Sequence, residues 1–271
     1  MLELLSYDFI QYALIIGIAL ALSAALLSPF LVLNQQAMIA DGLAHVSFAG
    51  LILGILFIEQ PLYIAIPFVM LASLFIKYLS TSKTINGDAA IGLVSAISFA
   101  IGLIIIKKSS GFNISVESML VGNIFTATKA DMFLSVLIAL IIISFILTSY
   151  RKLFLMTYDI NYAKFSKINT NLYGYLLAGL TAFFIVIGVR TIGTLLISAL
   201  VVFPSVISSQ LTKSFKGTLT IGIVSSLIIV VIGIFIAHPL ETPVGSTIVL
   251  LYAILLLFIL LIKQIKRRTI S

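Results

Sequence analysis

The chain consists of long runs of apolar residues, separated by short stretches that hold most of its polar and charged residues. A helix that crosses a membrane needs about 20 predominantly apolar residues, and nine runs approach or exceed that length. The runs are not short segments of alternating apolar and polar residues, which the strands of an outer-membrane barrel would require. The pattern therefore predicts an all-α membrane protein, a polytopic bundle of about eight or nine transmembrane helices.

The predicted spans follow these runs, with ends that are approximate to several residues. They are Phe9 to Leu33, Leu43 to Ile58, Leu62 to Leu79, Ala89 to Ile106, Met132 to Ser149, Leu172 to Val189, Ile192 to Leu211, Leu219 to Ala237 and Val244 to Ile262. Residues Ile114 to Ala127 are semi-apolar and too short to span, so we interpret them as a re-entrant or surface helix. We treat residues 1–271 as a single transmembrane domain.

The amino-acid composition also indicates a membrane protein, and it limits the residue types that a metal site or an enzyme active site could use. Hydrophobic residues make up 61% of the chain, charged residues make up 9%, and the mean hydropathy is +1.27. A soluble chain would carry about a quarter of its residues as charged side chains. The sequence has no cysteine and two histidines, so a metal site must use His, Asp, Glu or backbone oxygen. No nucleotide-binding loop, G-x-S-x-G or H-E-x-x-H motif occurs, which argues against an enzyme and against ATP hydrolysis by this chain.

The charged residues predict an orientation in the membrane. The net charge of +7 comes from Lys and Arg in short loops and at the C-terminus, as the positive-inside rule describes, and does not indicate nucleic acid binding. This rule places two basic groups in the cytoplasm: Arg151, Lys152, Lys164 and Lys167, and Lys263, Lys266, Arg267 and Arg268. The C-terminus is then cytoplasmic and the N-terminus lies outside. Lys107, Lys108 and Lys129 fall on the outer side, against the rule.

Two ionisable residues at the start of the second predicted span carry the most informative chemistry. Asp41 and His45 are spaced i, i+4, which on a helix puts both on one face with Cβ atoms about 6 Å apart. Each could give one ligand to a divalent cation at about 2 Å. Alternatively, Asp41 caps the helix and His45 hydrogen-bonds to a neighbouring carbonyl, and the spacing alone does not choose between these readings. Two ligands are few for tight zinc binding, but a transport site must also release its ion.

Other polar residues fit simpler roles. We interpret His238 and Glu241 as interfacial residues in a proline-rich loop, and Arg190 as a side chain that snorkels to the membrane surface. Glu117 and Asp131 are interpreted as loop charges. Their types and positions are compatible with attracting cations, but nothing in the sequence requires that role.

The central loop, residues 151–167, mixes aromatic and basic side chains over a length that allows a short helix on the membrane surface. One reading is a positively charged interfacial loop. The other is a docking surface for a cytoplasmic partner. Composition does not decide between them.

The segment Asp41 to Gly50, with the sequence D-G-L-A-H-V-S-F-A-G, resembles the segment that marks the membrane permeases of ATP-binding-cassette importers for zinc and manganese. Further stretches resemble the remaining landmarks of that family, in the same order: Asp88 to Ser95, Glu117 to Asn123, Thr157 to Ala163, Gly193 to Pro204 and Pro243 to Leu250. The resemblance covers nearly the whole chain, and the order of the landmarks makes it specific.

This resemblance implies a permease subunit in a bacterial plasma (inner) membrane, with the fold of the vitamin B12 and iron-siderophore importers but fewer spans. It implies three protein partners: a cytoplasmic ATP-binding subunit, an extracytoplasmic metal-binding protein and a second copy of the chain. Asp41 and His45 match the family's metal-contacting pair. The residues that match its short coupling helix to the ATPase are Thr157, Tyr158, Asp159, Ile160, Asn161, Tyr162 and Ala163.

The transported substrate, rather than a resident cofactor, is then Zn²⁺ or Mn²⁺. The form Leu-Ala-His-Val-Ser resembles the zinc-type members, which favours Zn²⁺. Asn34 and Gln35 stand where many members have a basic residue, and Ala40 replaces a usual glycine, so a family role for a basic residue there is in doubt. The alternatives are a self-sufficient secondary carrier of divalent cations and a membrane scaffold or sensor that transports nothing.

Overall fold

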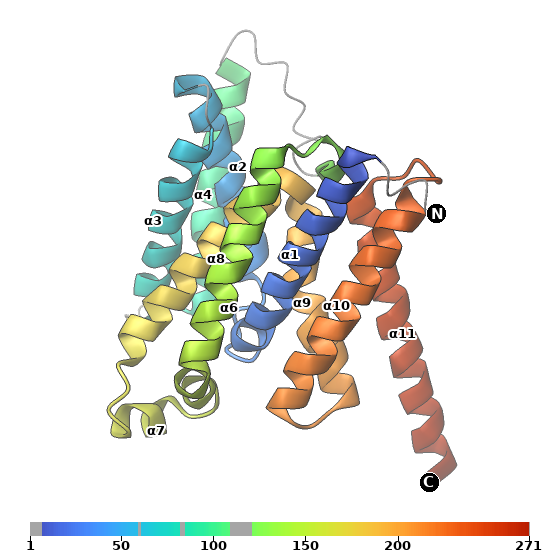
Figure 1. Cartoon of the computed structure of the whole chain (residues 1–271). Helices are drawn as coiled ribbons and strands as arrows, with labels where there is room; N and C mark the ends of the chain where they lie inside the picture. Colours follow the sequence, from blue (N-terminus) through green and yellow to red (C-terminus); the bar gives the residue numbers. More distant parts are fainter. Residues whose placement is uncertain (1–6, 59–60, 82–84, 109–120, 271) are drawn as a thin grey trace.

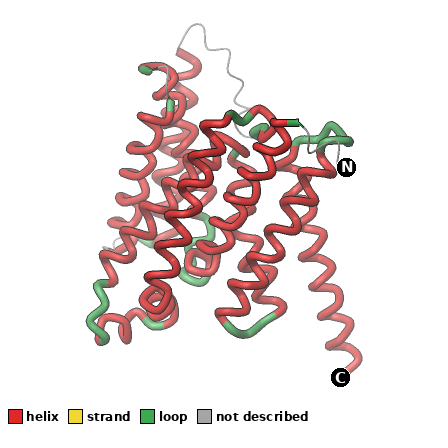
Figure 2. Tube along the Cα trace, viewed as in Figure 1, coloured by secondary structure: helices red, strands yellow, loops and turns green. Residues whose placement is uncertain are grey.

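The computed structural model describes residues 7–58, 61–81, 85–108 and 121–270. These residues form helices and loops only (Figure 2). The long helices are α1 (Asp8–Val32), α2 (Ile39–Phe57), α3 (Leu62–Thr81), α4 (Gly87–Lys108), α6 (Lys129–Tyr158), α8 (Thr170–Ile192), α9 (Thr194–Leu211), α10 (Phe215–Ala237) and α11 (Val244–Ile270). The short ones are a 3₁₀ turn, η2 (Ile124–Thr126), and α7 (Ile160–Phe165).

Nine of the described helices are long and apolar enough to cross a membrane, which confirms the predicted all-α polytopic bundle. Each of the nine predicted spans overlaps one of these helices. The largest differences are at two ends: α6 continues past Ser149 to Tyr158, and α11 continues past Ile262 to Ile270. Hydropathy locates the apolar part of a helix, whereas the helix itself continues for as long as its backbone hydrogen bonds do.

The long helices run roughly side by side, and the two chain ends lie at opposite ends of the bundle (Figure 1). We refer to the end with the N-terminus as the N-end and to the end with the C-terminus as the C-end. The C-end also holds α7 and the start of α2, whereas the N-end holds η2 and the loop between α10 and α11 (Figure 1). The first half of the predicted helix Ile114 to Ala127, residues 114–120, lies outside the described residues, and its described part, from Val121, contains η2.

Helix α1 forms the centre of the bundle. It packs against α6, α9 and α10, while α2 packs against α3 and α4, and α8 connects the two groups through α3, α2 and α6. Most of α1 and α2 is buried, but α11 exposes large apolar side chains along much of its length. Because lipid is as apolar as the side chains that face it, such exposure is ordinary for an outer helix of a membrane bundle.

Candidate metal pair and its surroundings

The structure places Asp41 and His45 on one face in the first two turns of α2, at the C-end of the bundle. His45 Nε2 lies 3.9 Å from Asp41 Oδ2. Two ligand atoms that each bind a metal at about 2 Å with tetrahedral geometry are about 3.3 Å apart, so a small side-chain rotation brings the pair within range of one ion. The side chains are 52% exposed for Asp41 and 30% exposed for His45, which leaves both accessible to a cation.

Neither of the structural alternatives for this pair is present in the described part of the chain. The N-cap residue of α2 is Met38, and no side chain caps it there. His45 Nδ1 is buried without a hydrogen-bond partner. The imidazole instead packs against the ring of Phe99 on α4, with 4.8 Å between the ring centroids. The pair is therefore held in place by its helix and by an aromatic neighbour, and the two atoms that face each other are Asp41 Oδ2 and His45 Nε2.

The pair alone does not make a complete metal site. Among the described residues, no third His, Cys, Asp or Glu joins it to form a group that could hold a metal ion. Zinc normally takes four ligands, and manganese takes more. Glu117, the acidic residue of a predicted landmark, lies outside the described residues.

The predicted coupling residues lie at the junction of α6 and α7. Asp159 ends α6 and begins α7, where its carboxylate accepts hydrogen bonds of 2.9 Å from the backbone N–H groups of Asn161 and Tyr162. This cap satisfies two of the N–H groups that a helix start leaves free. At the other end of α7, Lys167 adopts a positive φ of 59° and the next N–H, from Ile168, bonds to the carbonyl of Ala163.

Helix α7 turns one small side chain inward and large ones outward. Ala163 is fully buried, whereas Ile160, Tyr162 and Phe165, and Tyr158 at the end of α6, are each at least half exposed, and Phe165 reaches 85%. Lys164 and Lys167 lie in the same stretch. We call these four exposed residues the α7 patch. Exposed aromatic rings are enriched at protein interfaces, whereas aromatic residues together with lysines also suit a membrane surface, so both interpretations of this stretch remain open.

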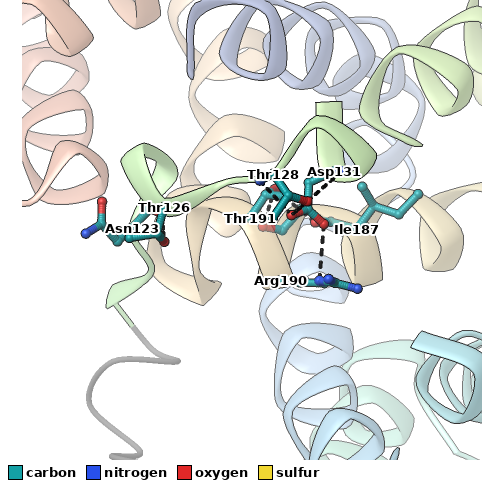
Figure 3. Close-up of polar contacts among 8 residues, drawn as sticks. Asn123, Thr126, Thr128, Asp131, Ile187, Arg190 and Thr191 are labelled. Atoms are coloured by element: carbon teal, nitrogen blue, oxygen red, sulfur yellow. Dashed lines mark hydrogen bonds and ion pairs between the residues drawn. The ribbon is translucent and has the colours of Figure 1, made fainter. Parts of the chain in front are cut away.

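At the N-end, the structure corrects two interpretations made from the sequence. Asp131 is not a free loop charge, because its side chain is only 8% exposed and its Oδ1 lies 3.2 Å from Arg190 Nε (Figure 3). Its other oxygen accepts hydrogen bonds from the backbone N–H and the hydroxyl of Thr128, which completes a capping box at the start of α6. Arg190 therefore pairs with a buried carboxylate across α6 and α8, a contact that the snorkelling interpretation did not include.

At the same end, two glycines allow the backbone before η2 to pack directly against the backbone between α8 and α9. Gly122 and Gly193 have positive φ angles of 68° and 85°. A Cβ on Gly122 would overlap the amide nitrogen of Gly193, and one on Gly193 would lie 2.5 Å from the carbonyl oxygen of Val121. Both the conformation and the spacing therefore require glycine. This contact fixes the segment before η2 against the tight link between α8 and α9.

The remaining histidine lies beside a cavity of about 440 Å³ at the N-end, which His238, Glu241 and Asn123 help to line. Phe9 stacks on the imidazole with 6.1 Å between ring centroids, and Phe125 meets it edge-on at 5.9 Å. The location agrees with the interpretation of His238 and Glu241 as residues of a loop at the end of the helices. They lie at the opposite end of the bundle from Asp41 and His45.

Sequence reasoning proposed Asp41 and His45 as a metal pair and Thr157 to Ala163 as a coupling segment, which remain predictions, and it missed the contacts at the N-end. A signal for part of this arrangement was present, since Asp131 stands three residues after Thr128, the spacing of a capping box, and Arg190 directly follows a predicted span. No sequence signal pairs Gly122 with Gly193, because the two are far apart in the chain and each has only a generic turn role.

Comparison with known proteins supports a metal importer. The model of the ABC 3 transport family matches residues 6–263. A probable iron transport system membrane protein of Haemophilus influenzae is 29% identical over 99% of this chain and 98% of its own length. The manganese import system permease protein ScaB of Streptococcus gordonii is 28% identical over 93% of this chain and 90% of its own length.

Two solved structures share the fold. The first, PsaBC from Streptococcus pneumoniae in complex with Fab, has a TM-score of 0.82 at 28% identity and covers 94% of this chain and 92% of the matched chain. The second is an inward-facing conformation of a putative metal-chelate type ABC transporter, with a TM-score of 0.71 at 19% identity over 93% and 84% of the two chains. At that identity, the second likeness concerns the fold alone.

These matches span nearly the whole chain and agree with the landmarks found in its sequence. They identify a multi-pass, non-catalytic membrane subunit, which works with an ATPase and a binding protein, and they argue against a self-sufficient carrier. The Haemophilus and Streptococcus relatives carry the names of iron and manganese systems, and neither is named for zinc. The chain belongs to the ABC 3 transport family, as the permease subunit of an ATP-binding-cassette importer for divalent metal.

Proposed function

We propose that this permease passes a divalent transition metal across the membrane by way of Asp41 and His45, driven by an ATPase that docks on the α7 patch. The observation that carries the proposal is the 3.9 Å approach of two accessible ligand atoms on a helix otherwise lined by buried apolar residues. Ionisable groups within a membrane span are costly and usually mark a transport path. Asp41 supplies charge and an oxygen ligand, and neutral His45 supplies Nε2.

A metal coordination shell with only two ligands from one chain is suited to transport. A site with two protein ligands binds an ion weakly enough to release it, and water, backbone oxygen or a second copy of the chain supplies the remaining ligands. We propose that two copies form the working permease, with an extracytoplasmic metal-binding protein at the N-end and the ATPase at the C-end. The basic residues of the central loop and of α11 support a cytoplasmic C-terminus.

Two transition metals are candidates for the cargo. The segment Leu-Ala-His-Val-Ser favours Zn²⁺, whereas the name of the ScaB relative favours Mn²⁺. One carboxylate and one imidazole accept either ion. We keep Zn²⁺ as the first cargo to test and Mn²⁺ as its competitor.

The test is uptake of radiolabelled Zn²⁺ by cells that lack their own high-affinity importer and express the partner subunits with each permease variant. We expect Asp41→Ala/His45→Ala to lose uptake at equal membrane levels. The matched control is His238→Ala/Glu241→Ala, which removes a histidine and a carboxylate from the opposite end and should keep most of the uptake. Strong inhibition by excess unlabelled Mn²⁺ would assign the cargo to manganese. Equal uptake by wild type and the Asp41/His45 variant would overturn the proposed site.

A further inference from the structure

Five aromatic rings gather at the C-end of the bundle, around the first residue of α10. Phe215 contacts rings from two other helices, with centroid distances of 5.2 Å to Phe30 on α1 and 5.1 Å to Phe154 on α6. Tyr150 and Tyr158, also on α6, each lie 6.0 Å from Phe215. Phe30 and Phe215 are buried, although they lie close to the end of the membrane-spanning helices. We call these five residues the aromatic cluster.

The aromatic cluster is continuous with the proposed docking surface. Tyr158 belongs to the α7 patch, being more than half exposed, and its ring also packs on Phe154 at 4.8 Å. Tyr158 is the last residue of α6, and only Asp159 separates it from α7. A displacement of α7 therefore reaches Tyr158 through the backbone, and the ring of Tyr158 contacts Phe154 and Phe215. Packed rings at these distances cannot be compressed, so such a displacement must move α1 and α10 as well.

A second contact joins the same region to the start of α2. The Asn34 amide donates a 2.6 Å hydrogen bond to the carbonyl of Phe30 and lies 3.4 Å from the hydroxyl of Thr157. Thr157 stands in the last turn of α6, directly before the α7 junction, and its hydroxyl also bonds to the carbonyl of Leu153. Asn34 therefore ties the end of α1 to the helix that leads into α7.

The link from Asn34 to the metal pair is short and hydrogen-bonded. Gln35 takes a positive φ of 59°, and the N–H of Gln36 bonds to the carbonyl of Leu31 at 2.9 Å. The N–H of Ile39, the first residue of α2, then bonds to the carbonyl of Gln36 at 3.1 Å. Asp41 follows within the same helical turn. This turn of the chain connects α1 to α2 without a flexible spacer.

We infer that the aromatic cluster and Asn34 transmit movement of the ATPase-docked α7 to the Asp41 and His45 end of α2. In this arrangement Phe215 is a positioning residue, since it touches neither the ATPase nor the metal. It holds α1 and α10 in fixed relation to the end of α6. The inference rests on the proposed docking of the ATPase on the α7 patch, and it assigns a separate, buried set of residues to transmission.

Replacing Phe215 tests the transmission. In Phe215→Leu the ring is lost while the site stays apolar, so α1 and α6 lose the one ring of the aromatic cluster that contacts both Phe30 and Phe154. We expect the ATPase to bind and hydrolyse ATP, while the amount of metal transported per ATP falls by roughly three- to tenfold. The assay uses proteoliposomes with the ATPase subunit and measures ATP hydrolysis alongside uptake of radiolabelled Zn²⁺ and, separately, Mn²⁺.

Two further variants separate transmission from general loss of packing. Phe203→Leu removes a ring outside the aromatic cluster, which stacks on Tyr252 between α9 and α11 with 5.2 Å between the ring centroids. This variant should transport as much metal per ATP as the wild type. Phe215→Tyr keeps the ring and should also keep the wild-type amount of metal transported per ATP. If Phe215→Leu does not reach the membrane, Phe215→Met takes its place, because it has a similar volume without a ring.

The outcomes distinguish this inference from the proposed function. If Phe215→Leu or Phe215→Met transports as much metal per ATP as the wild type, the inference is overturned, while the proposed docking of the ATPase is unaffected. An equal fall in metal transported per ATP in Phe203→Leu also overturns the inference, because the loss would then come from weaker helix packing in general. Failure of the wild-type chain to bind the ATPase through the α7 patch would overturn the proposed function first, and copurification of the two subunits detects it before any ratio is measured.

Discussion

The two ends of the bundle are held together by different kinds of contact. At the N-end, the backbones at Gly122 and Gly193 touch, and a buried ion pair joins α6 to α8. At the C-end, rings join α1, α6 and α10, and α7 exposes more rings to its surroundings. Backbone contacts between glycines leave no room to adjust, whereas exposed side chains can exchange one partner for another. The comparison indicates an N-end whose helices are joined by contacts without room for adjustment, and a C-end whose exposed rings are available to the ATPase that we propose docks there.

The largest effect is expected at the glycine contact. Gly122→Ala or Gly193→Ala forces an alanine into a positive φ and into a neighbouring backbone, so little folded protein should reach the membrane. Gly92→Ala is the control, because a Cβ there meets nothing within 4 Å and the residue lies inside α4. That variant should keep or slightly raise stability, by up to about 1 kcal/mol. Size-exclusion profiles of detergent extracts measure the folded yield of each variant.

If Gly122→Ala and Gly193→Ala yield wild-type amounts of folded protein, the N-end is not fixed by this contact. The contrast between the two ends would then rest on the ion pair alone.

The next effect concerns the C-end and should leave the fold unchanged. Tyr162 and Phe165 are exposed, so replacing both by alanine removes rings without opening a cavity. We expect affinity for the ATPase subunit to fall by more than about tenfold, as at other interface hot spots, with an unchanged thermal midpoint. Copurification and a binding titration in detergent give the affinity.

The control for the α7 patch is Phe133→Ala, which removes a similarly exposed ring from α6 near the N-end. It should leave ATPase binding unchanged. Equal loss of binding in Phe133→Ala would show that exposed rings in general, rather than the α7 patch, affect the association.

A smaller effect is expected at the ion pair. Asp131→Asn keeps the shape of the side chain but leaves Arg190 without its charged partner, which should lower stability by about 1–3 kcal/mol. Arg190→Gln in the same chain should restore part of the loss, because no uncompensated charge then remains. Thermal unfolding of the two single variants and the double variant gives the coupling free energy. A coupling near zero would contradict a structural role for this pair.

The smallest effect should come from a contact that belongs to neither end. Ser73 on α3 donates a 2.9 Å hydrogen bond to the carbonyl of Ala178 on α8. Such bonds between membrane helices contribute about 0.6 kcal/mol on average, so Ser73→Ala should lower the unfolding free energy by about that amount. Ser209→Ala, which removes a bond within a single helix, provides the baseline for the same unfolding measurement. A Ser73 effect larger than the ion-pair effect would reverse the order expected for these two contacts.

The sequence by itself determined the class of protein, the number of spans and the face that carries Asp41 and His45. These follow from local rules: a span needs a fixed length of apolar chain, and residues four apart on a helix share a face. The coupling segment was predicted only through the resemblance to a permease family, because the composition of that loop fits a membrane-surface helix as well as a docking surface. Which of that segment's side chains stay exposed was not readable, since exposure depends on what packs behind α7.

Only the tertiary structure decided which distant residues meet. The sequence indicated a lone interfacial cation at Arg190, whereas the packing of α8 against α6 pairs it with Asp131. Phe215 lies outside the predicted spans and had no predicted role, whereas the structure surrounds it with rings from α1 and α6. The sequence pattern records whether a residue suits lipid, water or a helix, but it does not record which other helix lies beside it. Lipid and protein neighbours are equally apolar, so hydropathy cannot distinguish them, and helix packing alone makes the choice.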